Sequence, residues 1–178
     1  MKRTRKGRSK LILVFGGAAS GKSQAALDLA GQVGPRAFLA TGQALDGEMA
    51  ERIRRHRALR SSDWVTAEVS VDLVTWFKEQ GTAYRTIVLD CLTLWLSNLR
   101  QRRVAGSAVP AKVSELLRAI RAASAKVVVV SNELGLGLVP VSRAGRGFRD
   151  LAGRVNQQVA AEADEVYFII SGVSVRIK

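Results

Sequence analysis

The sequence predicts an α/β protein with a mainly parallel β-sheet and helices on both of its faces. Short apolar runs typical of buried strands alternate along the chain with segments whose apolar residues recur at helical spacing. The runs within residues 86–90 and 126–131 are continuously apolar at their centre, as expected for strands that are covered on both sides. This alternation indicates a parallel sheet between two layers of helices, and ligands of such sheets bind at the carboxyl ends of the strands.

The individual elements follow from local patterns. Residues 11–15 form an apolar run that ends in two glycines, and residues 22–32 then carry alanine and leucine at helical spacing. A second strand is expected at residues 36–41, before a strongly charged helix at residues 48–59. The remaining predicted elements, in chain order, are a strand at 86–90, helices at 92–101 and 113–123, a strand at 126–131, a helix at 148–163, and strands at 165–170 and 173–177.

Length and composition exclude several classes of protein. The 178 residues suffice for one domain with a full hydrophobic core, which we expect to span residues 11–178. A hydrophobic fraction of 47% and a charged fraction of 24% exclude a disordered or collagen-like chain. The single cysteine, Cys91, cannot form an internal disulfide, which favours a reducing compartment such as the cytoplasm. No apolar run approaches the roughly 20 residues that cross a bilayer, so we expect no membrane span.

The chain is strongly basic, with 28 Lys and Arg residues against 15 Asp and Glu residues. Residues 1–10 carry no acidic residue and lack the apolar core of a secretory signal, so we expect a disordered basic tail there. The alternative for this tail is an arm that binds nucleic acid or another anionic surface. The rest of the chain is also basic, which favours polyanionic ligands such as nucleotides.

A complete phosphate-binding motif follows the first predicted strand. It reads Gly16-Gly17-Ala18-Ala19-Ser20-Gly21-Lys22-Ser23 and matches G-x-x-x-x-G-K-[ST] in the required context of strand, loop and helix. Small residues let the main-chain N–H groups and the helix N-terminus approach a phosphate. Lys22 is expected to reach the β and γ phosphates, and the Ser23 hydroxyl to ligate Mg²⁺. The sequence therefore predicts a nucleoside triphosphate site on a P-loop NTPase-like (RecA-like) fold.

Asp90 ends an apolar strand, which is the place of the carboxylate that supports Mg²⁺ in many phosphate-loop enzymes. A role as N-cap of the following helix is the alternative, and the two roles are compatible. The guanine-reading tetrapeptide N-K-x-D of small GTPases is absent from the sequence, so a GTPase switch is disfavoured. A nucleic-acid-binding ATPase is also disfavoured, because aromatic residues make up only 6% of the chain and its tryptophans fall in separate elements.

The only histidine of the chain, His56, lies in the charged helix expected at residues 48–59. On a continuous helix Arg52, His56 and Arg60 share one stripe, and Met49 and Ile53 can anchor a neighbouring stripe to the body of the domain. Guanidinium groups bind phosphate oxygens, and their positive charge favours the neutral, nucleophilic imidazole. The pattern permits attack of a histidine on phosphorus. It equally permits an incidental histidine on a solvated face, and periodicity alone does not decide between them.

Several segments together resemble the bifunctional adenosylcobinamide kinase and adenosylcobinamide-phosphate guanylyltransferase family. After the phosphate loop the matching segments are Ala40-Thr41-Gly42, then Asp46-x-Glu48-Met49-x-x-Arg52-Ile53-x-x-His56-Arg57-x-x-Arg60, and Trp64-x-Thr66-x-Glu68. Further matches are Asp90-Cys91-Leu92-Thr93, Ser131-Asn132-Glu133-x-Gly135-x-Gly137, and Phe148-Arg149-Asp150-x-x-Gly153-Arg154-x-Asn156-Gln157. The resemblance covers residues 11–178, and the histidine-containing segment is far more specific than the phosphate loop.

The resemblance implies two reactions on the route to cobalamin. ATP or GTP phosphorylates the aminopropanol hydroxyl of adenosylcobinamide, and GTP then donates GMP to that phosphate through a covalent guanylyl-histidine, which matches His56 here. Lys22 and His56 are then the expected catalytic residues, and Ser23 and Asp90 are the expected ligands of Mg²⁺. The nucleotide contacts that the resemblance implies are Gly16, Gly17, Ala18, Ala19, Ser20, Gly21, Lys22, Ser23, Ala40, Thr41, Gly42, Arg57, Ala58, Leu59, Arg60, Glu68 and Asp90. The resemblance also implies a homo-oligomer, a trimer by analogy. Because aromatic residues are few and the tryptophans lie in separate elements, we expect no nucleic-acid partner.

These implications lead to a geometric hypothesis. One GTP would lie with its β and γ phosphates on residues 16–23 while His56 approaches its α phosphate, so the helix at residues 48–59 must lie near the phosphate loop or move there. A relative that retains only one of the two reactions is the remaining alternative.

Overall fold

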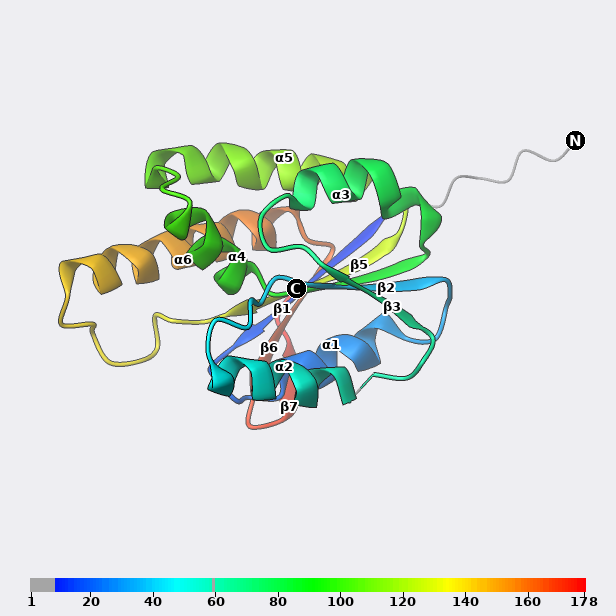
Figure 1. Ribbon diagram of the computed structural model, residues 1–178, viewed down its shortest axis with the longest axis horizontal. Coiled ribbons are helices and arrows are strands. Elements are labelled where there is room, and N and C mark those ends of the chain that lie inside the picture. The colour runs from blue at the N-terminus through cyan, green and yellow to red at the C-terminus, as the bar shows by residue number, and fades with distance from the viewer. Residues whose placement is uncertain (1–8, 59) are drawn as a thin grey trace, which may run out of the picture.

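The computed structural model describes residues 9–58 and 60–178, and it does not describe the side chains of Arg52 and His56. Within this part of the chain seven strands form one sheet in the order β3-β2-β4-β5-β1-β6-β7 (Figure 1). All neighbouring strands are parallel except β6 and β7, which are antiparallel. The predicted fold class, a mainly parallel sheet with helices on both faces, is therefore confirmed.

The strands and helices alternate along the chain as the sequence predicts. The strands are β1 (Lys10–Gly16), β2 (Arg36–Ala40), β3 (Trp64–Glu68), β4 (Thr86–Asp90), β5 (Lys126–Asn132), β6 (Glu165–Ile170) and β7 (Val173–Arg176). The helices are α1 (Lys22–Ala30), α2 (Gly47–Ala58), α3 (Leu73–Gln80), α4 (Leu92–Gln101), α5 (Val109–Ala122) and α6 (Arg143–Glu162), with short 3-10 turns at Gly81–Ala83 and Gly106–Ala108.

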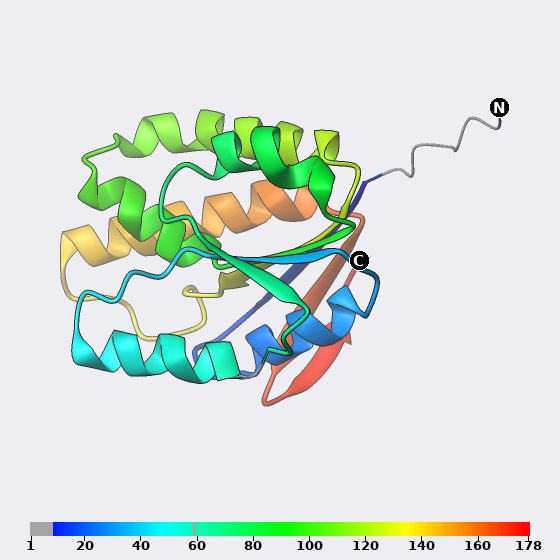
Figure 2. The ribbon, with the colours of Figure 1, turned by 45° about the vertical axis from the view of Figure 1, so that its right-hand side comes forward.

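Two helical layers cover the sheet, with α1 and α2 on one face and α3 to α6 on the other (Figures 1 and 2). Successive residues of a strand point to opposite faces. In β1, Leu11 and Leu13 therefore join the apolar core beneath α3 to α6, whereas Ile12 and Val14 join the core beneath α1. This alternation explains why the central strands are apolar throughout. No helix of the described residues combines the length and apolarity needed to cross a membrane.

Two elements of the structure are not predicted from the sequence. β3 is an edge strand whose side chains are mostly exposed, so its apolar pattern is weak. α3 is only eight residues long, and its buried face consists mainly of Leu73 and Phe77, one helical turn apart. Both elements are stabilised by contacts with distant segments more than by a local pattern.

Several predicted helix boundaries also differ from the structure: α1 ends at Ala30 instead of residue 32, and α5 begins at Val109 instead of residue 113. α6 begins five residues before the expected residue 148, because the Ser142 hydroxyl caps it by accepting a hydrogen bond from the Gly145 N–H at 3.0 Å. α2 ends at Ala58, and a turn follows in which the Arg60 N–H donates to the Arg57 carbonyl at 3.1 Å. The prediction that Arg60 continues the helical stripe of Arg52 and His56 is therefore wrong, because Arg60 lies beyond the end of the helix.

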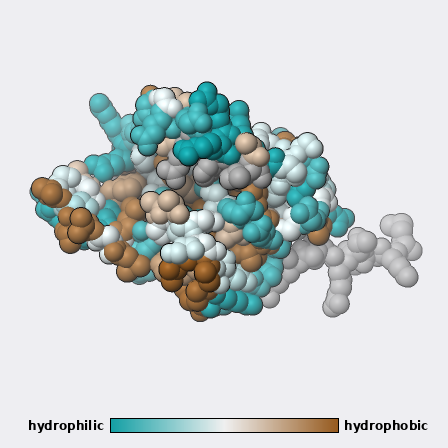
Figure 3. Space-filling view, turned by 90° about the horizontal axis from the view of Figure 1, so that it is seen from below, coloured by the Kyte–Doolittle hydropathy of each residue, from teal (hydrophilic) through white to brown (hydrophobic). Residues whose placement is uncertain are grey.

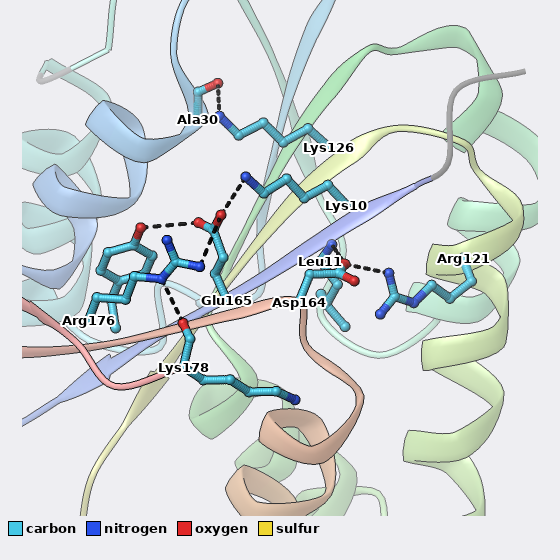
Figure 4. Close-up of polar contacts among 10 residues, drawn as sticks. Lys10, Leu11, Ala30, Arg121, Lys126, Asp164, Glu165, Arg176 and Lys178 are labelled. Carbon is cyan, nitrogen blue, oxygen red and sulfur yellow. Dashed lines mark hydrogen bonds and ion pairs between the residues drawn. The ribbon is translucent and has the colours of Figure 1, made fainter. Parts of the chain in front are cut away.

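Charged side chains at the amino end of the central strands are paired with one another (Figure 4). Lys10 contacts Glu165 at 2.6 Å, and the same carboxylate accepts a hydrogen bond from the Tyr167 hydroxyl at 3.1 Å. Asp164 accepts hydrogen bonds from the Leu11 N–H at 2.8 Å and from Arg121 at 2.6 Å. Lys10, which the sequence analysis assigns to the tail, thus belongs to β1, and residues 1–8 of the predicted tail lie outside the described part.

Candidate active site

A cavity of about 340 Å³ lies at the carboxyl edge of the sheet on the face of α1 and α2. Its walls come from the phosphate loop, the ends of β2 and β4, and the helix α2. The lining residues that the sequence singled out are Ala19, Ser20, Gly21, Lys22, Ser23, Ala40, Gly42, Met49, Ile53, Arg57, Arg60 and Asp90. The phosphate loop and α2 therefore face one shared space, as the hypothesis of a single GTP requires.

The phosphate loop depends on two of its glycines. A Cβ atom at Gly16 would lie 2.5 Å from the Ile169 carbonyl oxygen, which no side chain tolerates. Gly21 has a φ of 95°, a left-handed conformation that side chains disfavour, and α1 begins directly after it. The loop consequently turns tightly from β1 into the N-terminus of α1, where the N–H groups of the first helical turn favour an anion.

Lys22 and Ser23 connect the loop to its surroundings. The buried Lys22 ammonium donates hydrogen bonds to the Gly17 carbonyl and to the Ser20 hydroxyl, the latter at 3.5 Å. The Ser23 hydroxyl donates to the Asp90 carboxylate at 2.8 Å, although the two residues are 67 positions apart in the sequence. A hydroxyl and a carboxylate in direct contact are oxygen donors of the kind that Mg²⁺ prefers, so this pair could hold the ion.

The helix α2 contributes both packing and positive charge. The Ile53 side chain lies against Gly42, where an added Cβ would come within 3.9 Å of it, and Met49 lines the cavity one turn earlier. Arg57 forms an ion pair with Glu68 at the end of β3. Ile53 thus lies against the body of the domain, whereas the anchoring role predicted for Met49 stays a prediction.

Arg60 is held over the ring of Phe38, with its guanidinium carbon 3.9 Å from the ring centroid. Burial lowers the pKa of Arg60, the positive charge of Arg57 lowers it further, and Asp90 opposes both effects. Its Nε atom is buried and has no hydrogen-bond partner among the residues that the structure describes. A phosphate in the cavity would relieve this concentration of positive charge.

Not every residue expected to contact the nucleotide lines the cavity. Those outside its lining are Gly16, Gly17, Ala18, Thr41, Ala58 and Glu68. Leu59 lies outside the described residues, and so does the side chain of His56, whose backbone belongs to α2. The contacts of these residues with a nucleotide stay predictions.

Thr41 is occupied by contacts within the protein. Its hydroxyl donates to the Cys91 carbonyl and accepts from the Cys91 N–H, both at 2.8 Å. Its N–H donates to the Asp90 carbonyl at 3.0 Å, and its carbonyl accepts from the Asn98 side chain at 2.8 Å. Thr41 thus joins the end of β2 to the end of β4 and fixes the backbone that carries Asp90.

Cys91 is buried beside this junction. Burial, followed by the negative charge of Asp90, raises the pKa of the Cys91 thiol to about 12. A thiol with this pKa is protonated at neutral pH and a poor nucleophile, so it contributes packing and no chemistry.

Several residues that line the cavity have no role predicted from the sequence. Asn132 lines it from the end of β5, and Phe38 and Leu94 contribute apolar wall. Asn132 belongs to a segment that resembles the family and lies at the end of an apolar strand. These two features could have marked it as a site residue. Phe38 and Leu94 carried no signal, because an apolar residue in a strand or helix usually belongs to the core.

Comparison with known proteins identifies the family. The family model described as cobinamide kinase / cobinamide phosphate guanyltransferase matches residues 12–177. The chain belongs to this family. The expected phosphate loop, the Asp90 strand and the α2 segment all fall within the matched region.

Relatives of known name agree with this membership. The chain is 41% identical over 180 residues to the bifunctional adenosylcobalamin biosynthesis protein CobU of Escherichia coli, covering 94% of this chain and 99% of the relative. It is 37% identical over 171 residues to CobP of Pseudomonas aeruginosa, described in the same words, covering 93% and 96%. The chain is thus similar over nearly full length to bifunctional enzymes of cobalamin biosynthesis.

A solved structure of low sequence identity shares the fold. A KaiC-like protein from Pyrococcus horikoshii superposes with a TM-score of 0.51 at 11% identity, covering 90% of this chain and 71% of that protein. The P4 protein of bacteriophage phi6, solved in complex with ADP, superposes with a TM-score of 0.49 at 17% identity, and the chain spans only 55% of its length. The first likeness supports the fold alone.

Proposed function

We propose that this chain catalyses both reactions of its family. It phosphorylates the aminopropanol hydroxyl of adenosylcobinamide with ATP or GTP, and it then transfers GMP from GTP to the new phosphate. The products of the second reaction are adenosyl-GDP-cobinamide and pyrophosphate. The observation that carries this proposal is the single cavity lined by both the phosphate loop and α2.

The kinase reaction relies on positioning and charge neutralisation. The main-chain N–H groups of residues 16–23 and the Lys22 ammonium hold the β and γ phosphates, and the acceptor hydroxyl attacks the γ phosphorus as its bond to the leaving nucleoside diphosphate breaks. Mg²⁺, held by Ser23 and Asp90, would neutralise charge on the phosphates when bound. The 2.8 Å contact between these two side chains supports their joint assignment.

The guanylyl transfer needs a protein nucleophile, because a phosphate acceptor is weak. A ring nitrogen of His56 attacks the α phosphorus of GTP, and the bond to the bridging oxygen breaks, so that pyrophosphate leaves on the phosphate loop. An oxygen of the acceptor phosphate then attacks the same phosphorus and releases the histidine. Arg57 and Arg60, which line the cavity, neutralise the charge that develops on the α phosphate.

We further propose a homo-oligomer, a trimer by family resemblance, that works in the cytoplasm. The buried, protonated thiol of Cys91 suits such a reducing compartment.

The deciding experiment labels the protein with GTP radioactive at the α phosphate. We expect an acid-labile adduct that is absent in His56→Ala and present in Arg55→Ala, an exposed neighbour on the same helix. GTP labelled at the γ phosphate leaves no label. Absence of the adduct from the intact protein would contradict the guanylyl transfer and leave a single-activity kinase.

A further inference from the structure

A second cavity, of about 470 Å³, lies on the opposite face of the sheet from the nucleotide cavity. Its walls are the carboxyl half of β1, the segment after β5, and one side of α6. Among the described residues none lines both cavities. A volume of this size suits part of a small-molecule ligand, and no nucleotide contact predicted above falls within it.

The second cavity adjoins the phosphate loop through two consecutive residues. Asn132 lines the nucleotide cavity, and its carbonyl accepts a hydrogen bond at 3.1 Å from Asn156, which lines the second cavity. The next residue, Glu133, lines the second cavity and donates its N–H to the Gly16 carbonyl at 2.8 Å. A residue that lines the second cavity is therefore hydrogen-bonded to the first residue of the phosphate loop.

Gly153 lines this cavity from the interior of α6. A glycine inside a helix costs stability relative to alanine, so it usually serves close packing. Here an added Cβ would meet no atom within 4 Å, so no neighbouring atom requires a glycine. The missing side chain instead leaves room in the cavity.

Polar side chains that could recognise a ligand surround this space. Arg154 and Gln157 line the cavity and make no hydrogen bond or ion pair within the part of the chain that the structure describes. A guanidinium donates hydrogen bonds, and a carboxamide both donates and accepts them, which suits a ligand rich in carboxamides and hydroxyls.

An apolar surface borders the cavity on the segment between β5 and α6. Leu138 and Val141 on this segment are almost fully exposed, at 96% and 98%. Figure 3 shows hydrophobic side chains gathered at the left end of the displayed face, where Figure 1 places this segment. Gly135 of the same segment lines the cavity, so one stretch of chain carries both part of the cavity wall and the apolar surface.

We infer that the second cavity is the binding site of the acceptor alcohol. It takes the hydroxyl-bearing arm of the corrinoid and its nearby carboxamides, with the hydroxyl toward the phosphate loop, while the apolar segment contacts the macrocycle. Gly153 is a specificity-determining residue because any side chain there would occupy the space of the arm. This inference rests on the proposed function, from which the chemical class of the acceptor is taken.

The test compares substitutions at two glycines of α6. Gly147 matches Gly153, because an added Cβ there also meets nothing within 4 Å, but it does not line the cavity. Alanine at either position should raise the melting temperature by a few degrees, since alanine favours the helix. Gly153→Leu should raise the KM for adenosylcobinamide by about tenfold or more with the KM for GTP unchanged, while Gly147→Leu leaves both unchanged.

Two further measurements keep the outcome decisive. Equilibrium dialysis with cobinamide, detected by its visible absorbance, should show weaker binding to Gly153→Leu, and the guanylyl adduct of that variant shows that it is folded. If Gly153→Leu does not form the guanylyl adduct, the milder variant Gly153→Ala is tested in its place. The inference then requires that Gly153→Ala raise the KM for adenosylcobinamide. Wild-type KM and wild-type binding in the Gly153 variants overturn the inference, whereas an intact protein that never phosphorylates cobinamide overturns the proposed function.

Discussion

The two ends of the same parallel sheet use charge in opposite ways. At the amino end, Lys10 pairs with Glu165, and Asp164 pairs with Arg121. At the carboxyl end, Arg57 pairs with Glu68 and lines a cavity together with Arg60, whose buried Nε has no hydrogen-bond partner among the described residues. Charges that are matched within the protein stabilise the fold, whereas a buried cationic group with an unsatisfied donor favours the binding of an anionic ligand. The amino end of the sheet is thus paired within the protein, and the carboxyl end carries the proposed nucleotide site.

The largest expected effect is at the carboxyl end. Lys22→Ala should lower the rate of the kinase reaction by about a hundredfold or more, because it removes the cation expected at the transferred phosphate. Its melting temperature should stay close to that of the parent protein. The rate of cobinamide phosphorylation checks this, with Lys78→Ala on the remote helix α3 as the control. An unchanged rate would contradict the placement of the triphosphate on the phosphate loop.

A stability effect without an activity effect is expected at the amino end. Asp164→Ala removes the acceptor of the Leu11 N–H and of Arg121, so it should lower the free energy of unfolding by about 2 kcal/mol. The kinase rate per folded molecule should not change. Urea unfolding measures the loss, and Glu115→Ala, an exposed carboxylate without a contact in the described residues, should shift the result by less than about 0.5 kcal/mol. A slower reaction in Asp164→Ala would show that the amino end of the sheet also affects catalysis, which contradicts the division of roles between the two ends.

The smallest expected effect depends on pH. The hydrogen bond from Lys10 is the main cause that holds the pKa of Glu165 below its usual value, Tyr167 adds to it, and burial opposes both. A carboxyl group with a lowered pKa stabilises the fold above its unfolded pKa and loses this contribution as the pH falls through the folded pKa.

Glu165→Gln should therefore lower the free energy of unfolding by about 1 kcal/mol at pH 7. The difference from the parent protein should shrink below about pH 4. Urea unfolding at pH 7 and at pH 3.5 checks the sign, with Glu162→Gln as the exposed control. A difference that grows on acidification would show that the ion pair is not its source.

The sequence predicted those parts of the fold and site whose signal is local. The phosphate loop is one contiguous motif, Asp90 directly ends an apolar strand, and Met49 with Ile53 marks the face of α2 that lines the cavity. The central strands were predictable because burial on both faces leaves a continuous apolar run.

The missed features depend on contacts between distant segments. β3 is exposed at the sheet edge, and the place of Arg60 is set by Phe38, which precedes it by 22 positions. The second cavity is built from β1, the segment after β5 and α6, so no single stretch of sequence describes it. The bond between Ser23 and Asp90 likewise depends on how β1 and β4 lie in the sheet.

The walls of the nucleotide cavity come from the segments that follow β1, β2 and β4 and from the end of β5. A molecule bound there bridges parts of the chain that otherwise communicate only through the sheet. Binding to the native state alone raises its stability by mass action. Occupancy should accordingly slow the amide hydrogen exchange of α2 and the phosphate loop together, so that these two segments open as one unit only when the ligand has left.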